Sequence, residues 1–297
     1  MFQCCASGSG GRRPPAAEVE ILEVPEAGVT LRPRTVKMFG WVPDLPDHRD
    51  RVLDLHPSKK RDLPVKGDLR TADTFPLYNQ GHLGSCTANA IGAAYHFAMI
   101  KQGLKDFTPS RLFVYYNERA MEGHVDTDSG AQIRDGIKSV AQLGVCDEKL
   151  WAYDIDRFTE KPPSAAYEAA VKCKVKEYAR VEQTLDDLKA CINAGFPFAF
   201  GFIVFSSFMS DEVKNTGRMK MPEMYDWPKG GHAVMGVGFN DEEKCFTIRN
   251  SWGEEWGDKG YFYMPYDYIT HPALARDFWA IKCIDEEDFP TRAFTMP

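Results

Sequence analysis

The chain has 297 residues, 43% of them apolar and 27% charged, which is enough to bury one or two hydrophobic cores. Its net charge of −7 argues against nucleic-acid binding through a basic face, and no run of 18 apolar residues could span a membrane. The first 20 residues lack the apolar core of a signal peptide, so we expect none and favour a cytoplasmic over a secreted protein.

The first 65 residues differ in composition from the rest of the chain. They contain eight prolines with charged residues between them, a spacing that prevents long helices and favours extended segments. A short strand is expected at 19–24. Phe39 and Trp41 are aromatic residues that a solvated linker would not need. We therefore expect residues 1–65 to be an extension that docks on the domain at 66–297.

Helical patterns dominate the first half of this domain. Residues 85–103 predict a helix that Ser85 caps and Gly103 ends. Further helices are expected at 110–123, 131–144 and 184–195, from apolar residues at helical spacing and from glycines at the ends.

Strand patterns dominate the second half. β-branched and aromatic runs, broken by Gly, Asp and Asn, predict strands at 196–205, 232–240, 244–252, 260–269 and 278–284. Because helices precede strands and do not alternate with them, we predict an α+β fold of two packed lobes. We place a helical lobe at about 66–172, a β-rich lobe at about 173–284 and a tail at 285–297.

Cys86 lies in the segment YNQGHLGSCTANA, at the mouth of the first predicted helix. Most free cysteines are small buried hydrophobes, but the potential at a helix N-terminus favours a thiolate. A thiolate also needs a base or a cation beside it to act as a nucleophile near neutral pH. The eight cysteines show no C-x-x-C spacing and no tight cluster with histidine, so we expect no metal ion and no cofactor.

Three further residues have the types that such a nucleophile requires. His232 opens a predicted strand after two glycines, which give its backbone room at a cleft. Asn250, near the end of the next strand, could orient the ring of His232, and Trp252 could shield that hydrogen bond from water. Gln80, six residues before Cys86, could donate to a developing oxyanion together with the Cys86 backbone N–H.

At this point the sequence resembles the papain family of cysteine peptidases over about residues 66–284. The resemblance rests on NQGHLGSC, GHAVMGVGF and RNSWGEEWGDKGYF together, of which the last is the most specific. It implies a papain-like two-lobe fold with a cleft between a helical and a β-barrel-like lobe. It also implies Cys86 as nucleophile, His232 as base and acid, Asn250 as the orienting residue and Gln80 in the oxyanion hole.

The resemblance also indicates where a peptide would bind. Ser129 and Gly130 lie where the family has a loop that pairs with the substrate backbone, although a helix N-cap at Asp128 or Ser129 is an equal interpretation. Ala131 and Ala233 would line the pocket for the second residue before the scissile bond, and their small size suggests room for a bulky apolar side chain. Trp252 is a further candidate for contact with substrate.

The chain departs from the family pattern at several places. Leu83 stands where the family has a cysteine bridged to the glycine loop, the loop at 124–130 has no cysteine, and Thr87 replaces an aromatic residue. The Pro-rich N-terminal segment looks like the bacterial branch that includes xylellain. We hypothesise that part of residues 20–50 lies over the cleft and restrains access until it is cleaved or displaced.

Several functional alternatives remain. We favour an endopeptidase, because the insert at 206–230 is more readily a surface loop than a plug that captures a chain terminus. Another acyltransferase, such as a transglutaminase or amidase, would share the chemistry but not the NSWG loop. A binding module on a catalytically silent fold would usually lose the nucleophile. The expected partners are a peptide or protein substrate, a possible protein inhibitor and the chain's own N-terminal segment.

Overall fold

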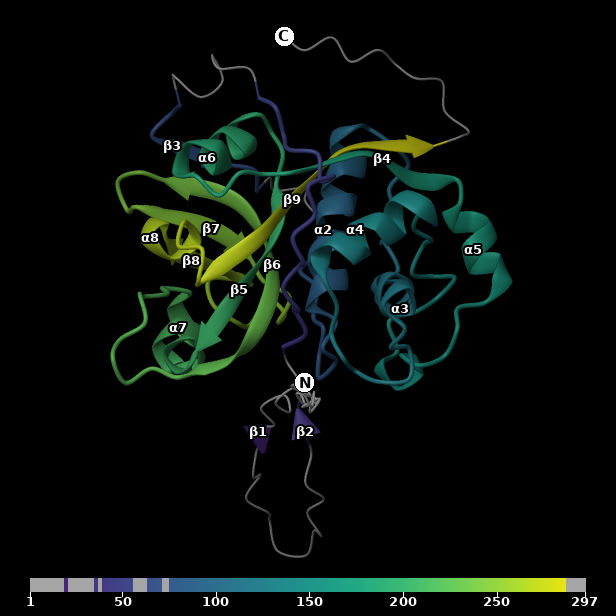
Figure 1. The fold of residues 1–297 in the computed structure, drawn as a ribbon, viewed down its shortest axis with the longest axis horizontal. Helices are drawn as coiled ribbons and strands as arrows, with labels where there is room; N and C mark the ends of the chain where they lie inside the picture. The colour runs from purple at the N-terminus through teal and green to yellow at the C-terminus, as the bar shows by residue number, and fades with distance from the viewer. Residues whose placement is uncertain (1–18, 21–34, 37–38, 56–62, 71–74, 287–297) are drawn as a thin grey trace, which may run out of the picture.

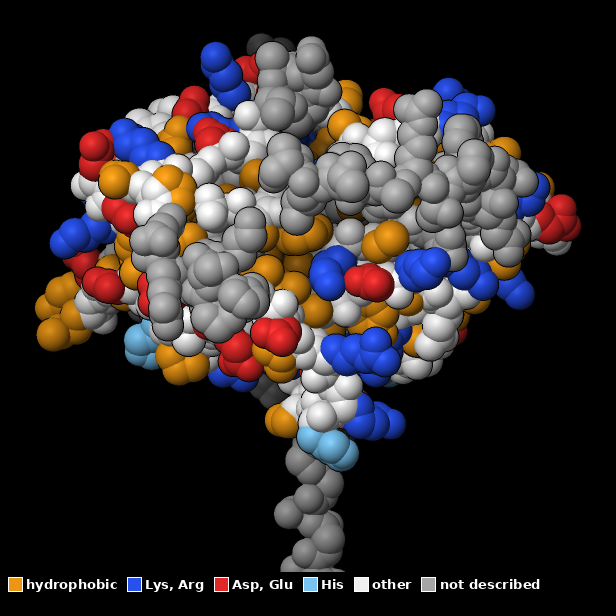
Figure 2. All heavy atoms as spheres, turned by 90° about the horizontal axis from the view of Figure 1, so that it is seen from above, with side chains coloured by type: hydrophobic (Ala, Val, Ile, Leu, Met, Phe, Trp, Pro, Cys, Tyr) orange, Lys and Arg blue, Asp and Glu red, His pale blue; other side chains and the backbone are white. Residues whose placement is uncertain are grey.

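The structure is a computed structural model, and it describes residues 19–20, 35–36, 39–55, 63–70 and 75–286. The earlier helices of the chain gather on one side of the molecule, and the antiparallel sheet lies on the other side together with the later, shorter helices (Figure 1). Seen from above, both signs of charge occur across the described part of the surface, and apolar side chains are exposed near its centre (Figure 2).

The helical side is built around one long helix, α2 (Cys86–Lys101). The following helix, α3 (Arg111–Glu122), is capped by Ser110, whose side chain accepts from Phe113 N at 3.2 Å. Gly123 ends α3 in the left-handed region with φ 76°. The α-helices are α2 (Cys86–Lys101), α3 (Arg111–Glu122), α4 (Ile133–Gln142), α5 (Ser164–Ala170), α6 (Leu185–Asn193), α7 (Asp211–Thr216) and α8 (Tyr266–Ile269), with 3-10 turns η1 (Ile155–Arg157) and η2 (Ser206–Met209).

The sheet has seven strands in the order β4-β9-β5-β6-β7-β8, with β3 paired to β6 off this path. All these pairs are antiparallel. The strands are β3 (Lys66–Asp68), β4 (Cys173–Arg180), β5 (Phe198–Phe205), β6 (Pro228–Asn240), β7 (Cys245–Arg249), β8 (Tyr261–Pro265) and β9 (Ala275–Glu286), and a separate two-stranded pair joins β1 (Val19–Glu20) to β2 (Thr35–Val36).

Helix α2 lies between the two halves and is buried along most of its length. It packs on β6, β9 and β5 as well as on α3 and α4. A helix that is apolar nearly all round suits such a position, because no face of it needs water. The N-terminus of α2 is thereby fixed against the middle of the sheet.

The strap, which we define as residues 39–55, runs between the helical half and the sheet (Figure 1). Trp41 N donates to Gly231 O of β6 at 3.0 Å. Val42 N donates to Ala131 O, just before α4, also at 3.0 Å. The beginning of the strap therefore bonds to both halves of the molecule at once.

The end of the strap continues along the sheet. Leu53 N donates to Arg180 O of β4 at 2.7 Å, and Arg180 N donates to Arg51 O at the same distance. The side chain of Leu53 is buried with the core of the sheet half. Both ends of the described segment are therefore docked on the domain.

The predicted order of helices followed by an antiparallel sheet is confirmed, and helices α2, α3, α4 and α6 lie within the predicted ranges. The expected strand at 19–24 is seen as Val19–Glu20, and residues 21–24 lie outside the described residues. The sequence missed β4, because a bulge between Val175 and Glu177 breaks the alternation of its side chains. No helix in the described ranges is long and apolar enough to cross a membrane.

Candidate active site

Cys86 is the first residue of α2 and is fully buried. The expected cap by Ser85 is wrong: within the described residues its side chain accepts no hydrogen bond from a backbone N–H of the first turn. The Ser85 hydroxyl instead bonds to the hydroxyl of Tyr153 at 2.5 Å and accepts from Asn89 Nδ2 at 3.1 Å. Tertiary partners have replaced the local cap, while the thiol still lies in the first helical turn.

His232 within β6 and Asn250 directly after β7 come together on neighbouring strands; β6 begins at Pro228, so the expectation that His232 opens its strand is wrong. Nε2 of His232 lies 2.8 Å from Oδ1 of Asn250, and both residues are buried. Since Oδ1 can only accept, His232 donates from Nε2, and its other nitrogen is then the basic one. Nδ1 has no hydrogen-bond partner among the described residues. The ring is thus oriented with one nitrogen available for a reacting group.

Trp252 covers this pair. Its indole stacks on the His232 ring at a centroid distance of 4.8 Å and an interplanar angle of 25°. Phe39 of the strap approaches both rings edge-on, at 6.4 Å from each. The indole therefore covers one face of the ring that bonds to Asn250, and contact of Trp252 with substrate stays a prediction.

Burial favours the neutral forms of both the Cys86 thiol and the His232 imidazole. Burial raises the pKa of Cys86 to about 12, although the backbone amides of Ala233 and Gly40 oppose this rise. Burial lowers the pKa of His232 to about 4, although the hydrogen bond to Asn250 opposes the fall. The Ala233 amide directly follows His232, so the thiol lies beside the strand that carries the histidine.

Gln80 ties the loop before Cys86 to the loop after Asn250. Its backbone N donates to Ser251 O at 2.8 Å, and its Oε1 accepts from the Ser251 hydroxyl at 2.7 Å. Its Nε2 donates to Leu83 O at 2.9 Å. The side chain is buried, and the four residues that the sequence selected thus belong to one region.

The glycine loop carries part of the expected peptide-binding surface. Ala131 N donates to Gly40 O of the strap at 2.8 Å, and Gly130 has φ 69°, where a Cβ would lie 2.0 Å from the same oxygen. Ser129 is exposed, and its hydroxyl donates to Gly130 O. The strap pairs with Ala131 and not with Ser129.

The alternative of a helix N-cap at Asp128 or Ser129 is wrong, because α4 begins at Ile133 with Gln132 before it. The Asp128 carboxylate instead accepts from Gly84 N, two residues before Cys86, at 3.0 and 3.1 Å. Asp128 therefore links the glycine loop to the loop of the nucleophile.

Ala233, Gly201 and Gly231 lie close together on the sheet, and none of them has a side chain larger than a methyl group. Gly231 and Ala233 alternate on β6, and Gly201 of β5 pairs with Ala233. The indole of Trp41 covers this face, since a Cβ on Gly201 would lie 1.9 Å from its Cε2 and one on Gly231 2.7 Å from its Cε3. Ala131 is also fully buried. The Trp41 indole thus occupies the place beside Ala233 where the resemblance puts a substrate side chain, and the subsite role of Ala131 and Ala233 stays a prediction.

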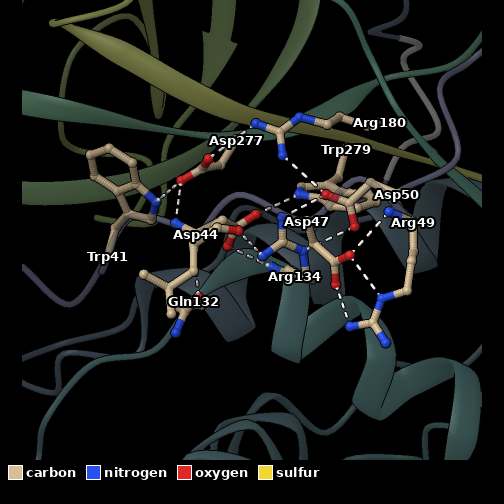
Figure 3. A network of polar contacts seen from close by, with 11 residues as sticks. Trp41, Asp44, Asp47, Arg49, Asp50, Gln132, Arg134, Arg180, Asp277 and Trp279 are labelled. Carbon is tan, nitrogen blue, oxygen red and sulfur yellow. Dashed lines mark hydrogen bonds and ion pairs between the residues drawn. The ribbon is translucent and has the colours of Figure 1, made fainter.

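Sequence reasoning missed a polar network that anchors the strap (Figure 3). Asp44 accepts from Trp279 Nε1 at 2.9 Å and from Arg134 N at 3.1 Å. Asp50 pairs with Arg134 at 2.5 Å and with Arg180 at 3.2 Å. Only the concentration of acidic residues in the segment WVPDLPDHRD could have pointed to these contacts.

A set of metal ligands is not apparent. Within the described ranges, no group of three or more His, Cys, Asp or Glu side chains is placed to hold a metal ion. Among the described cysteines, Cys86, Cys146, Cys191 and Cys245 form no disulfide.

Comparison with known proteins gives consistent relatives. The family model described as papain family cysteine protease matches residues 63–277. A peptidase C1-like protein of Acanthamoeba polyphaga mimivirus, itself uncharacterised, is 46% identical over 268 residues, which cover 82% of this chain and 86% of that protein. Pro-cathepsin H of Bos taurus is 29% identical over 67% of this chain and 59% of its own length.

Solved structures agree with the sequence relatives. Xylellain, a cysteine protease from Xylella fastidiosa, is 45% identical and has a TM-score of 0.79, covering 86% of this chain and 99% of that one. The proform of cathepsin B S9 from Trypanosoma congolense is 15% identical with a TM-score of 0.62, covering 77% and 80%, and is similar in fold alone.

Proposed function

The chain belongs to the papain family of cysteine proteases, and from that premise we propose that it cleaves peptide bonds with Cys86 as its nucleophile. His232 takes the thiol proton, and the thiolate attacks the scissile carbonyl carbon. His232 then protonates the leaving amine as the C–N bond breaks, which leaves a thioester on Cys86. Water, deprotonated by His232, attacks this thioester and releases the acid and the thiol.

The observation that carries this proposal is the orientation of His232. Its Nε2 bonds to Asn250, and its Nδ1 has no other partner in the described part of the chain. A base that is oriented by a third group and stands beside a thiol is the arrangement that nucleophilic catalysis requires. In this proposal Asn250 orients the ring, while Gln80 Nε2 and the Cys86 backbone N–H stabilise the oxyanion.

We further propose that the enzyme is an endopeptidase. An exopeptidase would need a charged group at the cleft to capture a chain terminus. Two of the cations in the insert at 206–230 are already paired with acidic neighbours: Lys220 with Glu212 at 2.8 Å, and Arg218 with Glu243. These pairs support an insert that leaves the cleft open to internal peptide bonds.

The strap acts as a mask in this proposal. Two contacts support that role: Gly40 O accepts from Ala131 N, and a Cβ on Gly40 would lie 1.7 Å from Gly84 O. The carbonyl of Gly40, whose backbone amide faces the thiol, is therefore bonded to Ala131 and not to the proposed oxyanion hole. A segment held in this way covers Cys86 but does not place one of its own peptide bonds where the thiolate could attack it.

The first experiment measures turnover of a quenched peptide library under reducing conditions. It compares the full chain, the full chain with Trp41→Ala, and each of these with Cys86→Ala. We expect turnover that Trp41→Ala increases and Cys86→Ala abolishes. Cys146→Ala removes a buried thiol outside this region and serves as the matched control, which should retain turnover.

Two outcomes would contradict the proposal. Equal turnover with and without the Cys86 thiol would assign the chemistry to another group. No turnover by either the full chain or its Trp41→Ala variant would favour the alternative, a binding module on a papain-like fold.

A further inference from the structure

A small cavity borders Asn250, the residue that orients His232. It has a volume of about 10 Å³ and lies between α2, β6 and the end of β7. A cavity of this size holds about one water molecule, provided that polar groups face it. Tyr78 lines the cavity, but its hydroxyl is bonded to His96 at 2.9 Å. The other polar side chains of the lining are Asn89, Arg249, Asn250 and Ser251.

The amide of Asn250 brings a donor to this cavity. Its Oδ1 bonds to His232 and accepts from Ser251 N at 2.9 Å. Its Nδ2 is buried and has no hydrogen-bond partner among the described residues. A buried donor without an acceptor costs free energy, so an acceptor is expected beside Nδ2.

The guanidinium of Arg249 brings a second donor. Its two Nη atoms donate to Tyr261 and to the carbonyls of Phe75 and Pro76. Its Nε is buried, and no atom in the described part of the chain accepts from it. Arg249 and Asn250 are only 4% and 3% exposed, so bulk water does not satisfy either donor.

The two remaining polar side chains supply acceptors. The amide nitrogen of Asn89 donates to Ser85, at 2.9 Å to its carbonyl and 3.1 Å to its hydroxyl. Oδ1 of Asn89 accepts from Arg111 at 3.2 Å, which leaves one of its two lone pairs. The hydroxyl of Ser251 donates to Gln80 at 2.7 Å, so towards the cavity its oxygen acts as an acceptor.

Two donors and two acceptors are the complement of one water molecule, which accepts twice and donates twice. We propose that the cavity holds one ordered water bonded to these four side chains, and that Arg249 is a positioning residue that acts through it. Arg249 Nε takes one lone pair of the water, and Asn89 and Ser251 accept both of its hydrogens. The remaining lone pair bonds only a donor, so Asn250 must turn Nδ2 to the water and Oδ1 to His232.

The orientation of this amide decides which nitrogen of neutral His232 carries the proton. If the amide of Asn250 flipped, its Nδ2 would donate to Nε2 of His232, and the ring proton would move to Nδ1. A ring protonated at Nδ1 cannot take the proton of Cys86. The backbone N–H of Ser251 opposes the flip at one end of the amide, and the water opposes it at the other. The kinetic consequence rests on the proposed peptidase function, whereas the water and the tautomer do not.

The first test looks for the water itself, in the full chain with Cys86→Ala, where no chemistry takes place. A high-resolution crystal structure should show one water within about 3.2 Å of both Arg249 Nε and Asn250 Nδ2. Crystals grown in bromide show by anomalous scattering whether a halide accepts from the two donors instead. A halide at this place, or no ordered water there, would overturn the proposal.

The second test replaces the Nε donor alone. Arg249→Lys puts a methylene where Nε lies but keeps a cation near the carbonyls of Phe75 and Pro76. In the Cys86→Ala chain, nitrogen NMR of isotope-labelled histidine should show a proton on Nε2 of His232 alone, and Arg249→Lys should change this to a mixture of tautomers. With Cys86 intact and Trp41→Ala present, we expect kcat to fall about tenfold with little change in KM.

Arg218→Lys is the matched control, since Arg218 is half exposed and pairs with Glu243 away from the cavity. It should change neither the tautomer nor kcat, and thermal unfolding checks that both variants fold. A single Nε2–H tautomer in folded Arg249→Lys would overturn the positioning role, whatever happens to kcat. If Arg249→Lys does not fold, the crystal structure of the Cys86→Ala chain decides. A tautomer shift without turnover by any chain would contradict the peptidase proposal and leave this one standing.

Discussion

Thr87 directly follows the proposed nucleophile, at a position where the resembling family has an aromatic residue. In place of an aromatic ring, its hydroxyl donates to Oε1 of Glu118 at 2.6 Å. Burial raises the pKa of Glu118 well above its usual range, although the hydrogen bond from Thr87 opposes this rise. A charged Glu118 would oppose a thiolate on Cys86, and a neutral one does so far less. The sequence gives no sign of this pair, because its partners lie 31 residues apart.

Gln80 is the residue whose proposed role is most directly testable by an isosteric change. Gln80→Glu keeps the acceptor for Ser251 but replaces the Nε2 donor with an oxygen. If Nε2 stabilises the oxyanion, kcat should fall by about a hundredfold or more while KM changes little. Steady-state kinetics in the Trp41→Ala background measure this split.

Gln142→Glu, at an exposed end of α4, introduces the same charge away from the cleft and controls for it. A fall in kcat of similar size in both variants, or an increase in KM alone for Gln80→Glu, would contradict the oxyanion role.

Among the elements, α3 joins the two loops that flank the nucleophile. The hydroxyl of Tyr115 donates to Asp128 and accepts from Gly130 N at 3.2 Å, while Asp128 accepts from Gly84 N. This chain of bonds connects the regions that a disulfide joins in the resembling family, where this chain has Leu83. We infer that hydrogen bonds hold the two loops together here without a cysteine bridge.

Tyr115→Phe removes only the hydroxyl from this chain of bonds. It leaves Gly130 N without an acceptor, which we expect to lower the free energy of unfolding by about 1–3 kcal/mol. We also expect KM for peptides to rise several-fold with a smaller effect on kcat, because the Gly84–Asp128 bond remains. Thermal unfolding and steady-state kinetics in the Trp41→Ala background test both effects.

Tyr116→Phe is the matched control, since this neighbour on α3 is only half-buried. Unchanged stability and KM in Tyr115→Phe would show that the hydroxyl does not position the glycine loop.

The strap couples the two halves of the whole molecule, and its docking should depend on pH. Burial, together with the carboxylate of Asp277, raises the pKa of Asp44 to about 6. Arg134 and Trp279 also face Asp44 and act in the opposite direction. Glu122 has its pKa raised to about 7, mainly by burial and in part by Asp44. The docked strap therefore holds a proton that the free strap would release near its ordinary pKa of 3.8.

The sign of the pH effect follows from this difference. Docking is strongest below about pH 4, where Asp44 is protonated in both states, and it weakens as the pH rises through 6. Asp44 alone changes the docking equilibrium by up to about a hundredfold. We expect turnover by the full chain to rise between pH 5 and 8 more steeply than turnover by the Trp41→Ala chain.

Asp44→Asn removes the titrating charge. We expect turnover by this variant to rise with pH no more steeply than turnover by the Trp41→Ala chain, even if the substitution weakens docking at every pH. The ratio of kcat/KM at pH 8 to that at pH 5, taken relative to the Trp41→Ala chain, measures the effect. The same ratio for the native chain and for Asp44→Asn would exclude Asp44 as its source.

The amino-acid sequence by itself determined the order of helices and strands and the four residues proposed for catalysis. Apolar periodicity, caps and β-branched runs are local signals, and the motifs around Cys86, His232 and Asn250 are each contained in one short segment. Its failures include Ser85, whose hydroxyl bonds to Tyr153, β4, where a bulge hides the alternation, and residues 266–269, which form helix α8 although the strand pattern at 260–269 includes them. At Ser85 a contact from elsewhere in the chain replaced the local rule.

The register in which the strap lies on the domain follows from tertiary packing alone. Trp41 and Asp277 lie 236 residues apart, and no periodicity in either segment predicts their bond. The same holds for Gly84 and Asp128, which are 44 residues apart. Pocket shape, strap register and the acceptor at Asp277 depend on backbone turns and close approach between distant segments, and these arise only when the two halves pack on each other.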